Sequence, residues 1–385
     1  MSWPMVKIDD VAEVLSGNAW KSSQFSSDSN AGLPVIRIQN VSSEKTEFVY
    51  WEGEPIERFI INNGDLLLSL SGNVKLCQWR FGKALLNQRV VRISPRAGVD
   101  SRYFYWVIDK IVLKLEALAK RAVIANVSVS DLKAFEIPLP PLAEQKRIAA
   151  ILDKADTIRR KRQQAIQLAD EFLRSVFLDM FGDPVTNPKG FPLGTIRDLV
   201  ESANYGSSAK ASEAGGDYPI LRMGNITYSG AIDMTDLKYI DLSEKEKTKY
   251  LAVKGDLLFN RTNSKELVGK AAVYDRDDPV AIAGYLIRVR INKKGNGYYV
   301  SGYLNSAHGK ATLQNMCKSI VGMANINAQE MQDIPILIPP VDLQNRYRDI
   351  FVYTKEKLAT HQMALSENNE LFDALSQRAF SGQLS

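Results

Sequence analysis

The sequence predicts an α+β protein with an internal duplication: two related α/β domains, each followed by one long helix. Three observations predict this fold. The same series of motifs occurs in the same order in both halves of the 385 residues. Short β-rich runs bounded by turn residues fill the first part of each half, and a near-heptad apolar pattern ends each half. The period is too long for a solenoid repeat, which favours duplication of a whole domain.

Paired motifs carry the repeat. In chain order, the pairs are residues 3–11 with 191–199, 33–37 with 218–222, 64–68 with 255–259, and 137–142 with 335–341. Gln145 and Gln344 follow the last pair at equal distance. The expected boundaries are therefore 1–140 and 183–338 for the domains, and 141–182 and 339–385 for the long helices.

The first part of each half is expected to be a mixed globule. Residues 35–38, 66–70 and 90–93 are β-rich and bounded by turn residues, which predicts strands. Between residues 103 and 119 the apolar side chains recur at helical spacing. They are Phe104, Val107, Ile108, Ile111, Leu115 and Leu118.

Paired prolines are expected to open the two long helices, because proline suits the first helical position. The pairs are Pro140-Pro141 and Pro339-Pro340, and Gly182-Asp183-Pro184 stops the first helix. Apolar positions of the first helix are Ile148, Ile151, Ala155, Ile158, Ala165, Ala169, Phe172 and Val176, with Arg162 as the main interruption. In the second, Phe351, Leu358, Leu365, Phe372 and Ala379 share one heptad position, and Thr354, His361, Asn368 and Leu375 share the other. Neither stripe should remain in water, so we expect the helices to form a coiled coil with each other.

Bulk composition narrows the function only slightly. The net charge of +5 and the pI of about 8.9 fit nucleic-acid binding weakly. Two cysteines, Cys77 and Cys317, are too few for a disulfide framework. The N-terminus does not resemble a signal peptide, and the apolar runs are far shorter than a bilayer span. We therefore expect a cytoplasmic protein.

A search for catalytic groups finds none. The two histidines, His308 and His361, do not cluster with cysteines, so no metal site is expected. Gly309-Lys310 lacks the rest of a phosphate-binding loop. Glu144-Gln145-Lys146 matches a nuclease-like Glu-x-Lys only formally, because it lies in the first turn of a helix. The basic run 159–162 is expected to be a solvated helix face, with contact to phosphates or a partner as the alternative.

Several segments resemble the specificity subunits of Type I restriction-modification systems. Residues 137–153 and 181–188 resemble the central conserved region of that family, and residues 378–384 resemble its C-terminal signature. Residues 255–264 resemble a segment of its target recognition domains. At the second helix start, Asp342 and Asn345 replace Ala143 and Lys146, which makes the two partner-binding surfaces unequal.

The resemblance implies a non-catalytic DNA-reading subunit that serves phage defence. Two target recognition domains would be separated by two antiparallel coiled-coil helices with a pseudo-two-fold relation. Each domain would read one half of a bipartite, asymmetric DNA target, and the helices would set the spacer. Two methyltransferase subunits carrying S-adenosylmethionine would dock on the helices, and motor-nuclease subunits using ATP and Mg²⁺ would join them. This chain itself would bind no cofactor and no metal.

Candidate DNA contacts are the polar residues that follow the shared strands, because direct readout requires such side chains on loops at groove depth. After the Gly-Asp-Leu-Leu strands these are Ser69, Ser71, Asn73 and Lys75 in the first domain, and Asn260, Arg261, Thr262, Asn263 and Lys265 in the second. Weaker candidates after the other shared strand are Arg37, Gln39, Arg222 and Asn225. The alternative for all of them is an ordinary surface turn.

Two other functions remain open from the sequence. One is a self-contained restriction or methylation enzyme with a fused recognition region, although the missing catalytic motifs argue against it. The other is a standalone DNA-binding regulator, which would bind DNA alone and ignore methyltransferase subunits.

Overall fold

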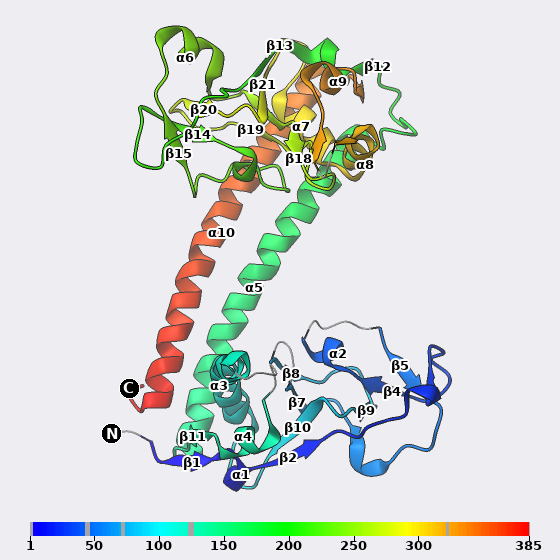
Figure 1. Cartoon of the computed structure of the whole chain (residues 1–385), viewed down its shortest axis with the longest axis vertical. Helices are drawn as coiled ribbons and strands as arrows, with labels where there is room; N and C mark the ends of the chain where they lie inside the picture. Colours follow the sequence, from blue (N-terminus) through cyan, green and yellow to red (C-terminus); the bar gives the residue numbers. More distant parts are fainter. Residues whose placement is uncertain (1–2, 43–46, 71–73, 122–126, 321–322, 385) are drawn as a thin grey trace. The chain divides into compact units, whose positions relative to one another are not determined.

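The computed structural model describes residues 3–42, 47–70, 74–121, 127–320 and 323–384, and it divides into two compact units. The first unit comprises Met1–Lys161 and Ala364–Ser385, and the second comprises Arg162–Met363. Each unit contains an α/β globule, the first part of one long helix and the last part of the other (Figure 1). Segments far apart in the sequence therefore share each core.

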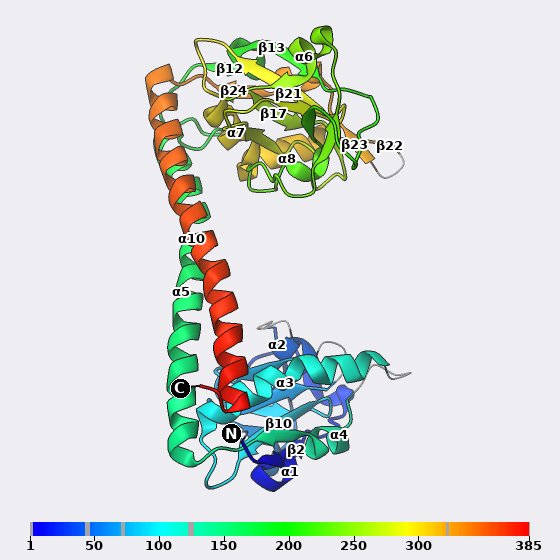
Figure 2. The same ribbon diagram turned by 90° about the vertical axis from the view of Figure 1, so that its left-hand side faces the viewer.

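Two stacked sheets and a short ribbon build the globule of the first unit. The four-stranded sheet has the order β2 (Ala12–Ser16), β10 (Val90–Pro95), β7 (Leu66–Ser69), β8 (Leu76–Gln78). The five-stranded sheet has the order β3 (Phe25–Ser26), β5 (Val49–Trp51), β4 (Leu33–Ile36), β9 (Ala84–Leu86), β6 (Ile60–Ile61). The ribbon pairs β1 (Met5–Lys7) with β11 (Glu136–Pro138), and the helices are α1 (Ile8–Val11), α2 (Ile38–Ser42), α3 (Ser101–Arg121) and α4 (Val129–Ala134). α3 lies across the four-stranded sheet, against β8 and β10 (Figure 2).

The second unit repeats this plan. Its central sheet has the order β13 (Val200–Tyr205), β21 (Leu286–Ile291), β17 (Leu257–Asn260), β19 (Ala271–Val273), and the outer sheet has the order β15 (Lys238–Ile240), β14 (Tyr218–Leu221), β20 (Val280–Ile282), β16 (Leu251–Ala252). The ribbon pairs β12 (Leu193–Thr195) with β24 (Pro335–Leu337), and a small sheet joins β18 (Thr262–Asn263), β23 (Met323–Asn325) and β22 (Lys318–Ile320). The helices are α6 (Glu244–Tyr250), α7 (Gly297–Asn305), α8 (Ala307–Met316) and α9 (Ala328–Gln332).

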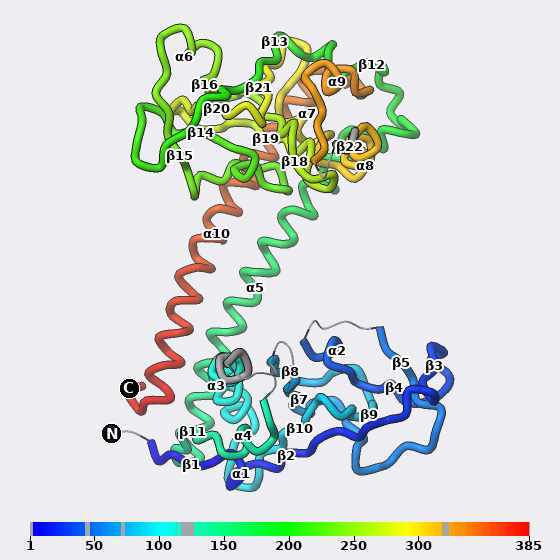
Figure 3. The backbone as a smooth tube through the Cα atoms, viewed as in Figure 1, coloured from blue at the N-terminus to red at the C-terminus, as the bar shows by residue number. Residues whose placement is uncertain are grey.

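The Gly-Asp-Leu-Leu motif forms the central strand in both units, and both faces of that strand are buried. Leu66 and Leu68 of β7 join the core that includes the long helices, whereas Leu67 joins the core on the opposite face, with the five-stranded sheet. Each unit therefore has a helical layer, in which α3 or α7 lies on the four-stranded sheet beside the long helices, then the four-stranded sheet, then the outer sheet (Figure 3). This sandwiching explains why the strand is a continuous apolar run instead of an alternating one.

A buried glutamine fixes each long helix to its globule. In α5 (Leu142–Phe181), Gln145 accepts from the Asp100 amide (2.8 Å) and donates to the Pro140 carbonyl (2.9 Å). In α10 (Val341–Ser381), Gln344 accepts from the Asn296 amide (2.9 Å) and donates to the Pro339 carbonyl (2.8 Å). Both side chains are buried. The repeated glutamine of the sequence is thus a structural link between helix and domain.

The expected fold is confirmed: two α/β domains and two long helices, which run in opposite directions within each unit. Some helix positions that were predicted to be buried are exposed. Ile158 is 42% exposed, Phe172 is 50% exposed, and His361, expected on the seam, is exposed. Other predicted positions, namely Ile148, Leu358, Phe372 and Ala379, are buried as expected, and they are joined by neighbours such as Leu173 and Phe177. One residue turns a helix by about 100°, and the buried face here contacts the globule as well as the other helix.

One predicted strand is also too long. Residues 35–38 were expected to be extended, but β4 ends at Ile36 and Ile38 starts α2. The Asn40 side chain accepts from the Arg37 amide (3.0 Å) and donates to the Glu47 carbonyl (3.1 Å). A short polar side chain that bonds nearby backbone in this way favours a turn over a continued strand.

Candidate nucleic-acid interface

The Gly-Asp pair that precedes each central strand shapes a tight turn. Gly64 and Gly255 have φ of 96° and 97°, a region that favours glycine. The Asp65 carboxylate accepts from the Asn62 amide (2.8 Å), and the Asp256 carboxylate accepts from the Val253 amide (2.9 Å). These motif residues therefore hold the strand entry, and the candidate contacts lie at its exit.

Three of the candidate contact residues are inside the protein. Ser69 and Asn260 are 0% exposed and Asn225 is 4% exposed. The Ser69 hydroxyl accepts from the Lys75 amide (2.9 Å), and the Asn260 amide group donates to the Met223 carbonyl (3.3 Å). Asn225 binds the backbone of Arg222 and Asp233, as Asn40 does in the first unit. Because these groups stabilise turns and do not reach the surface, we withdraw them as DNA contacts.

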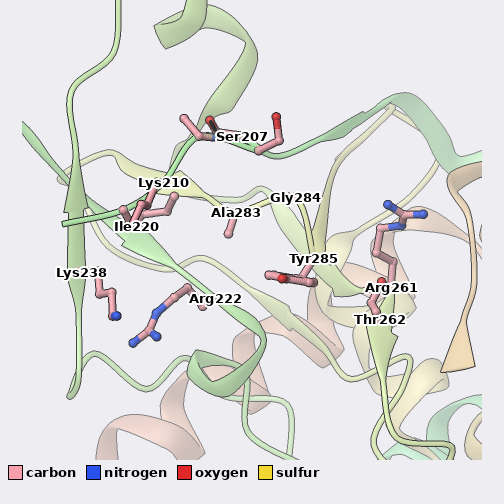
Figure 4. A pocket seen from close by; sticks show the side chains of 13 residues that line it. Ser207, Lys210, Ile220, Arg222, Lys238, Arg261, Thr262, Ala283, Gly284 and Tyr285 are labelled. Carbon is pink, nitrogen blue, oxygen red and sulfur yellow. Dashed lines mark hydrogen bonds between the residues drawn. The ribbon is translucent and has the colours of Figure 1, made fainter. Parts of the chain in front are cut away.

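Arg222, Arg261 and Thr262 come together around a cleft of about 570 Å³ in the second unit (Figure 4). Lys210, Lys238 and Tyr285 also line it, and the lining residues include no carboxylate. In the view of Figure 4, Tyr285 lies between Arg222 and Arg261. We call this the basic cleft. Its positive lining and exposed ring are suited to nucleic acid, because cations bind phosphates and arginine reads base edges.

Part of the positive charge around the basic cleft is paired at its rim. Arg222 contacts the Asp236 carboxylate (3.0 Å), and Lys238 contacts that of Glu213 (2.8 Å). Both carboxylates are largely exposed, so solvent screens these pairs and they contribute little. Incoming phosphates can therefore replace the two acids at little cost.

The other candidates lie outside the basic cleft or outside the described residues. Asn263 accepts from the Ser264 amide (2.9 Å), and Lys265 is exposed beyond the cleft lining. In the first unit, Arg37, Gln39 and Lys75 are half-buried. Ser71 and Asn73 lie outside the described residues.

Sequence reasoning missed a buried lysine that bonds to the backbone beside Arg222. Lys270 is 8% exposed, and its ammonium donates to the Met223 carbonyl (3.0 Å), next to Arg222. Burial lowers the pKa of Lys270. Its counterpart in the first unit is Lys75. The Lys270 carbonyl accepts from the amide of Asn260 (2.8 Å), and the Lys75 carbonyl accepts from the amide of Ser69 (3.0 Å), the equivalent strand end. The unequal lengths of the two loops hid this pair in the sequence.

Within the described residues, no group of three or more His, Cys, Asp or Glu side chains could hold a metal ion. His308 lies 6.0 Å from the Tyr303 ring, and His361 is exposed on α10. In the same part of the chain, no helix combines the length and apolarity that crossing a membrane requires. In the basic run of α5, Arg159 and Arg160 both pair with Asp156 (2.7 and 2.6 Å).

Comparisons with known proteins identify a family and related chains. The family of Type I restriction modification DNA specificity domains matches residues 2–168 and 188–367. The Type I restriction enzyme EcoKI specificity subunit of Escherichia coli K12 is 27% identical over 419 aligned residues, which cover 99% of this chain and 89% of that protein. The EcoBI specificity subunit of Escherichia coli is 24% identical over 419 residues, covering 100% and 86%.

Solved structures show the same fold. The S subunit of a Type I restriction-modification system from M. genitalium aligns with a TM-score of 0.63 at 15% identity, over 99% of this chain and 96% of that one. A chain from a structural study of Type I complex assembly aligns with a TM-score of 0.53 at 16% identity, over 100% and 98%. The chain belongs to the Type I restriction-modification DNA specificity family, as a DNA target specificity subunit.

Proposed function

We propose that the chain reads a bipartite, asymmetric DNA target, one half with each unit. The observation that carries this proposal is that one hydrogen-bonded frame occurs twice with different side chains at the exit of its central strand. The amide of Arg261 donates to the Tyr285 carbonyl (3.0 Å), and the amide of Leu70 donates to the Arg89 carbonyl (3.3 Å). The positions correspond, but their side chains differ, so the two half-sites should differ as well.

Family membership supports a division of labour within a complex. Specificity subunits of this family are not catalytic, and the cofactors belong to other subunits. We propose that two methyltransferase subunits dock on the helical region and bring S-adenosylmethionine, and that motor-nuclease subunits bring ATP and Mg²⁺. The cytoplasm is the proposed compartment, because the DNA target is there.

The test is to purify the full chain with the methyltransferase encoded in the same genome and to sequence the methylated bases. The expected result is one split motif with two unlike halves, and a complex with two methyltransferase copies by light scattering. Methylation by the chain alone would support the self-contained enzyme instead. Tight sequence-specific binding by the chain alone, with no association with the methyltransferase, would support the regulator.

We further propose that the long helices set the spacer between the half-sites. α5 has 40 residues and α10 has 41, so each helix extends about 60 Å at 1.5 Å per residue. Insertions after Ala155 would disturb the first core, which Ala155 contacts. The unit boundaries, after Lys161 in α5 and after Met363 in α10, are better insertion points.

Two insertion lengths test the spacer proposal. Seven residues in each helix preserve the heptad phase and add about 10 Å, or about 3 base pairs. Duplex DNA turns by roughly 100° over that distance, so binding should weaken or fail. About 25 residues add about 37 Å, or about 11 base pairs, which returns both the protein helix and the DNA close to their original phase. This variant should recover binding on the correspondingly longer spacer. Undiminished activity of both variants on the original spacer would disprove the proposal.

A further inference from the structure

Arg261 and Tyr205, which come from distant parts of the second unit, form a fixed pair at the basic cleft. The guanidinium carbon of Arg261 lies 4.7 Å from the centroid of the Tyr205 ring. We propose that this pair reads a guanine in the major groove, in the half-site of the second unit. The inference rests on the proposed function and adds to it one base identity and the residue that determines it.

Both members of the pair are held by the backbone. The Arg261 amide donates to the Tyr285 carbonyl (3.0 Å), and the Arg261 carbonyl accepts from the Ile326 amide (2.9 Å). The Tyr205 hydroxyl accepts from the Ala328 amide at the start of α9 (3.0 Å). Tyr205 also ends β13, so its ring is anchored at both ends. The pair is therefore ordered before any ligand arrives.

The guanidinium of Arg261 is available for a ligand. No ion pair joins it to an acid within the described residues, and its Nε is buried without a hydrogen-bond partner. The guanidinium lies over the Tyr205 ring, and the N–H groups of an arginine form a planar fork. Such a fork matches two acceptors lying side by side. In the major groove, only guanine offers that arrangement, through O6 and N7. Adenine presents one acceptor beside a donor, and thymine presents one acceptor beside a methyl group.

The neighbouring cations are better suited to phosphates. Lys210 and Lys238 carry flexible point charges, which bind phosphate without selecting a sequence. Arg222 is partly neutralised by Asp236 (3.0 Å). Among the cations of the basic cleft, Arg261 alone is stacked on a ring and unpaired within the described residues.

The first unit cannot read a base in the same way at this position. Leu70 occupies the place of Arg261, and it is 9% exposed. Ser16 occupies the place of Tyr205, because each ends its strand beside the equivalent residue of the central sheet, Val91 or Ile287. The guanine requirement should therefore be confined to one half-site.

The first experiment compares variants of the full chain in complex with its methyltransferase, using randomised duplex DNA and sequencing of the bound fraction. The unchanged chain should select guanine at one position of one half-site. Arg261→Ala removes the donors, so it should lose roughly 5- to 150-fold of preference for that guanine, in addition to any general loss of affinity. The matched control is Arg276→Ala, which removes a charge from an exposed turn outside the cleft lining and should keep the preference.

The second experiment changes the DNA and leaves the protein intact. Replacing the selected guanine by 7-deazaguanine removes the N7 acceptor, and the affinity of the unchanged chain should fall. Inosine keeps O6 and N7 and should bind as guanine does. The Arg261→Ala variant should no longer distinguish guanine from 7-deazaguanine.

Tyr205 is expected to act as a positioning residue, through Arg261. Tyr205→Phe keeps the ring and should keep the guanine preference, whereas Tyr205→Leu should lose it while thermal melting shows a folded protein. A uniform loss of affinity on all sequences, with a salt slope lower by about one for Arg261→Ala, would assign Arg261 to a phosphate and overturn the inference. Specific binding with no guanine in that half-site would also overturn it and leave the proposed function intact. Absence of any sequence preference would instead refute the proposed function.

Discussion

Replacing the buried glutamine of α10 tests how strongly the helices hold the DNA-reading units. In Gln344→Met the side chain keeps its length but loses its polar atoms. The Asn296 amide and the carbonyls of Pro339 and Lys294, at 2.9, 2.8 and 3.2 Å from the glutamine, lose their partner. A buried polar group without a partner costs about 1–3 kcal/mol. Since some of the groups can reach water after a small shift, we expect the free energy of unfolding to fall by about 2–4 kcal/mol.

The assay is thermal and urea unfolding followed by circular dichroism. For a unit of this size, 1 kcal/mol corresponds to about 2–4 °C, so the Tm should fall by roughly 5–15 °C. Gln362→Met is the matched control, because it makes the same change on an exposed position of the same helix. Equal melting of the two variants would refute the reasoning.

A charged replacement adds a second readout of the same site. Gln344→Glu keeps the shape, but its buried carboxylate cannot donate to the two carbonyls, and burial should raise its pKa. A carboxyl group whose folded pKa is raised stabilises the fold at low pH and loses that contribution as pH rises through the folded pKa. The variant should therefore be nearer to the unchanged chain in acid than at neutral pH.

The remaining predictions concern the two units separately. Gln145→Met should destabilise the first unit as Gln344→Met does the second, which separate unfolding transitions would reveal. The pure chain should transfer no methyl group and cut no DNA, as measured with labelled S-adenosylmethionine and plasmid cleavage; robust methylation by the chain alone would contradict this. Replacing roughly residues 1–135 by the domain of a relative should change one half-site in the methylation motif, and a change in both would exclude separate readers. Lys270 has a lowered pKa in the folded chain, so the folded state binds fewer protons and the stability of the unchanged chain should rise as pH approaches the ordinary lysine pKa of 10.5. Lys270→Met should remove this rise. Equal slopes of stability against pH for the two proteins would show that Lys270 is not desolvated.

The architecture could be predicted from the sequence because the same motifs recur in the same order in both halves. Gln145 and Gln344 were visible as a repeat, and the paired prolines marked the helix starts, α5 at Leu142 and α10 at Val341. These motifs hold the same backbone structure in both units, so their residues and spacing recur in the two halves of the sequence. The role of the glutamines was not predictable, because their partners are backbone groups of residues about fifty positions earlier.

The candidate contacts were predicted less well, for a geometric reason. The last residue of a strand points inward or outward according to register, and a shift of one residue reverses its side. Ser69 and Asn260 end their strands pointing inward, whereas Arg261 is the first residue that reaches the surface. The partner of Arg261 is Tyr205, and no local pattern connects residues so far apart. Lys270 was missed because burial of a lysine is rare enough that sequence reasoning places it at the surface.

The two units show how side chains can differ at the strand exit while the fold is kept. The frame depends on backbone hydrogen bonds and on a few inward side chains, such as Asn40 and Asn225, which have the same bonds in both units. At the exit of the central strand, the backbone bonds of Leu70 and Arg261 are also the same, although one side chain is apolar and the other cationic. The same backbone bonds thus carry a buried apolar side chain in the first unit and a half-buried cation in the second, so the frame accepts different side chains. Because the residues that hold the frame are not those that differ at the strand exit, the two units can present different chemistry, as the proposed reading of two unlike half-sites requires.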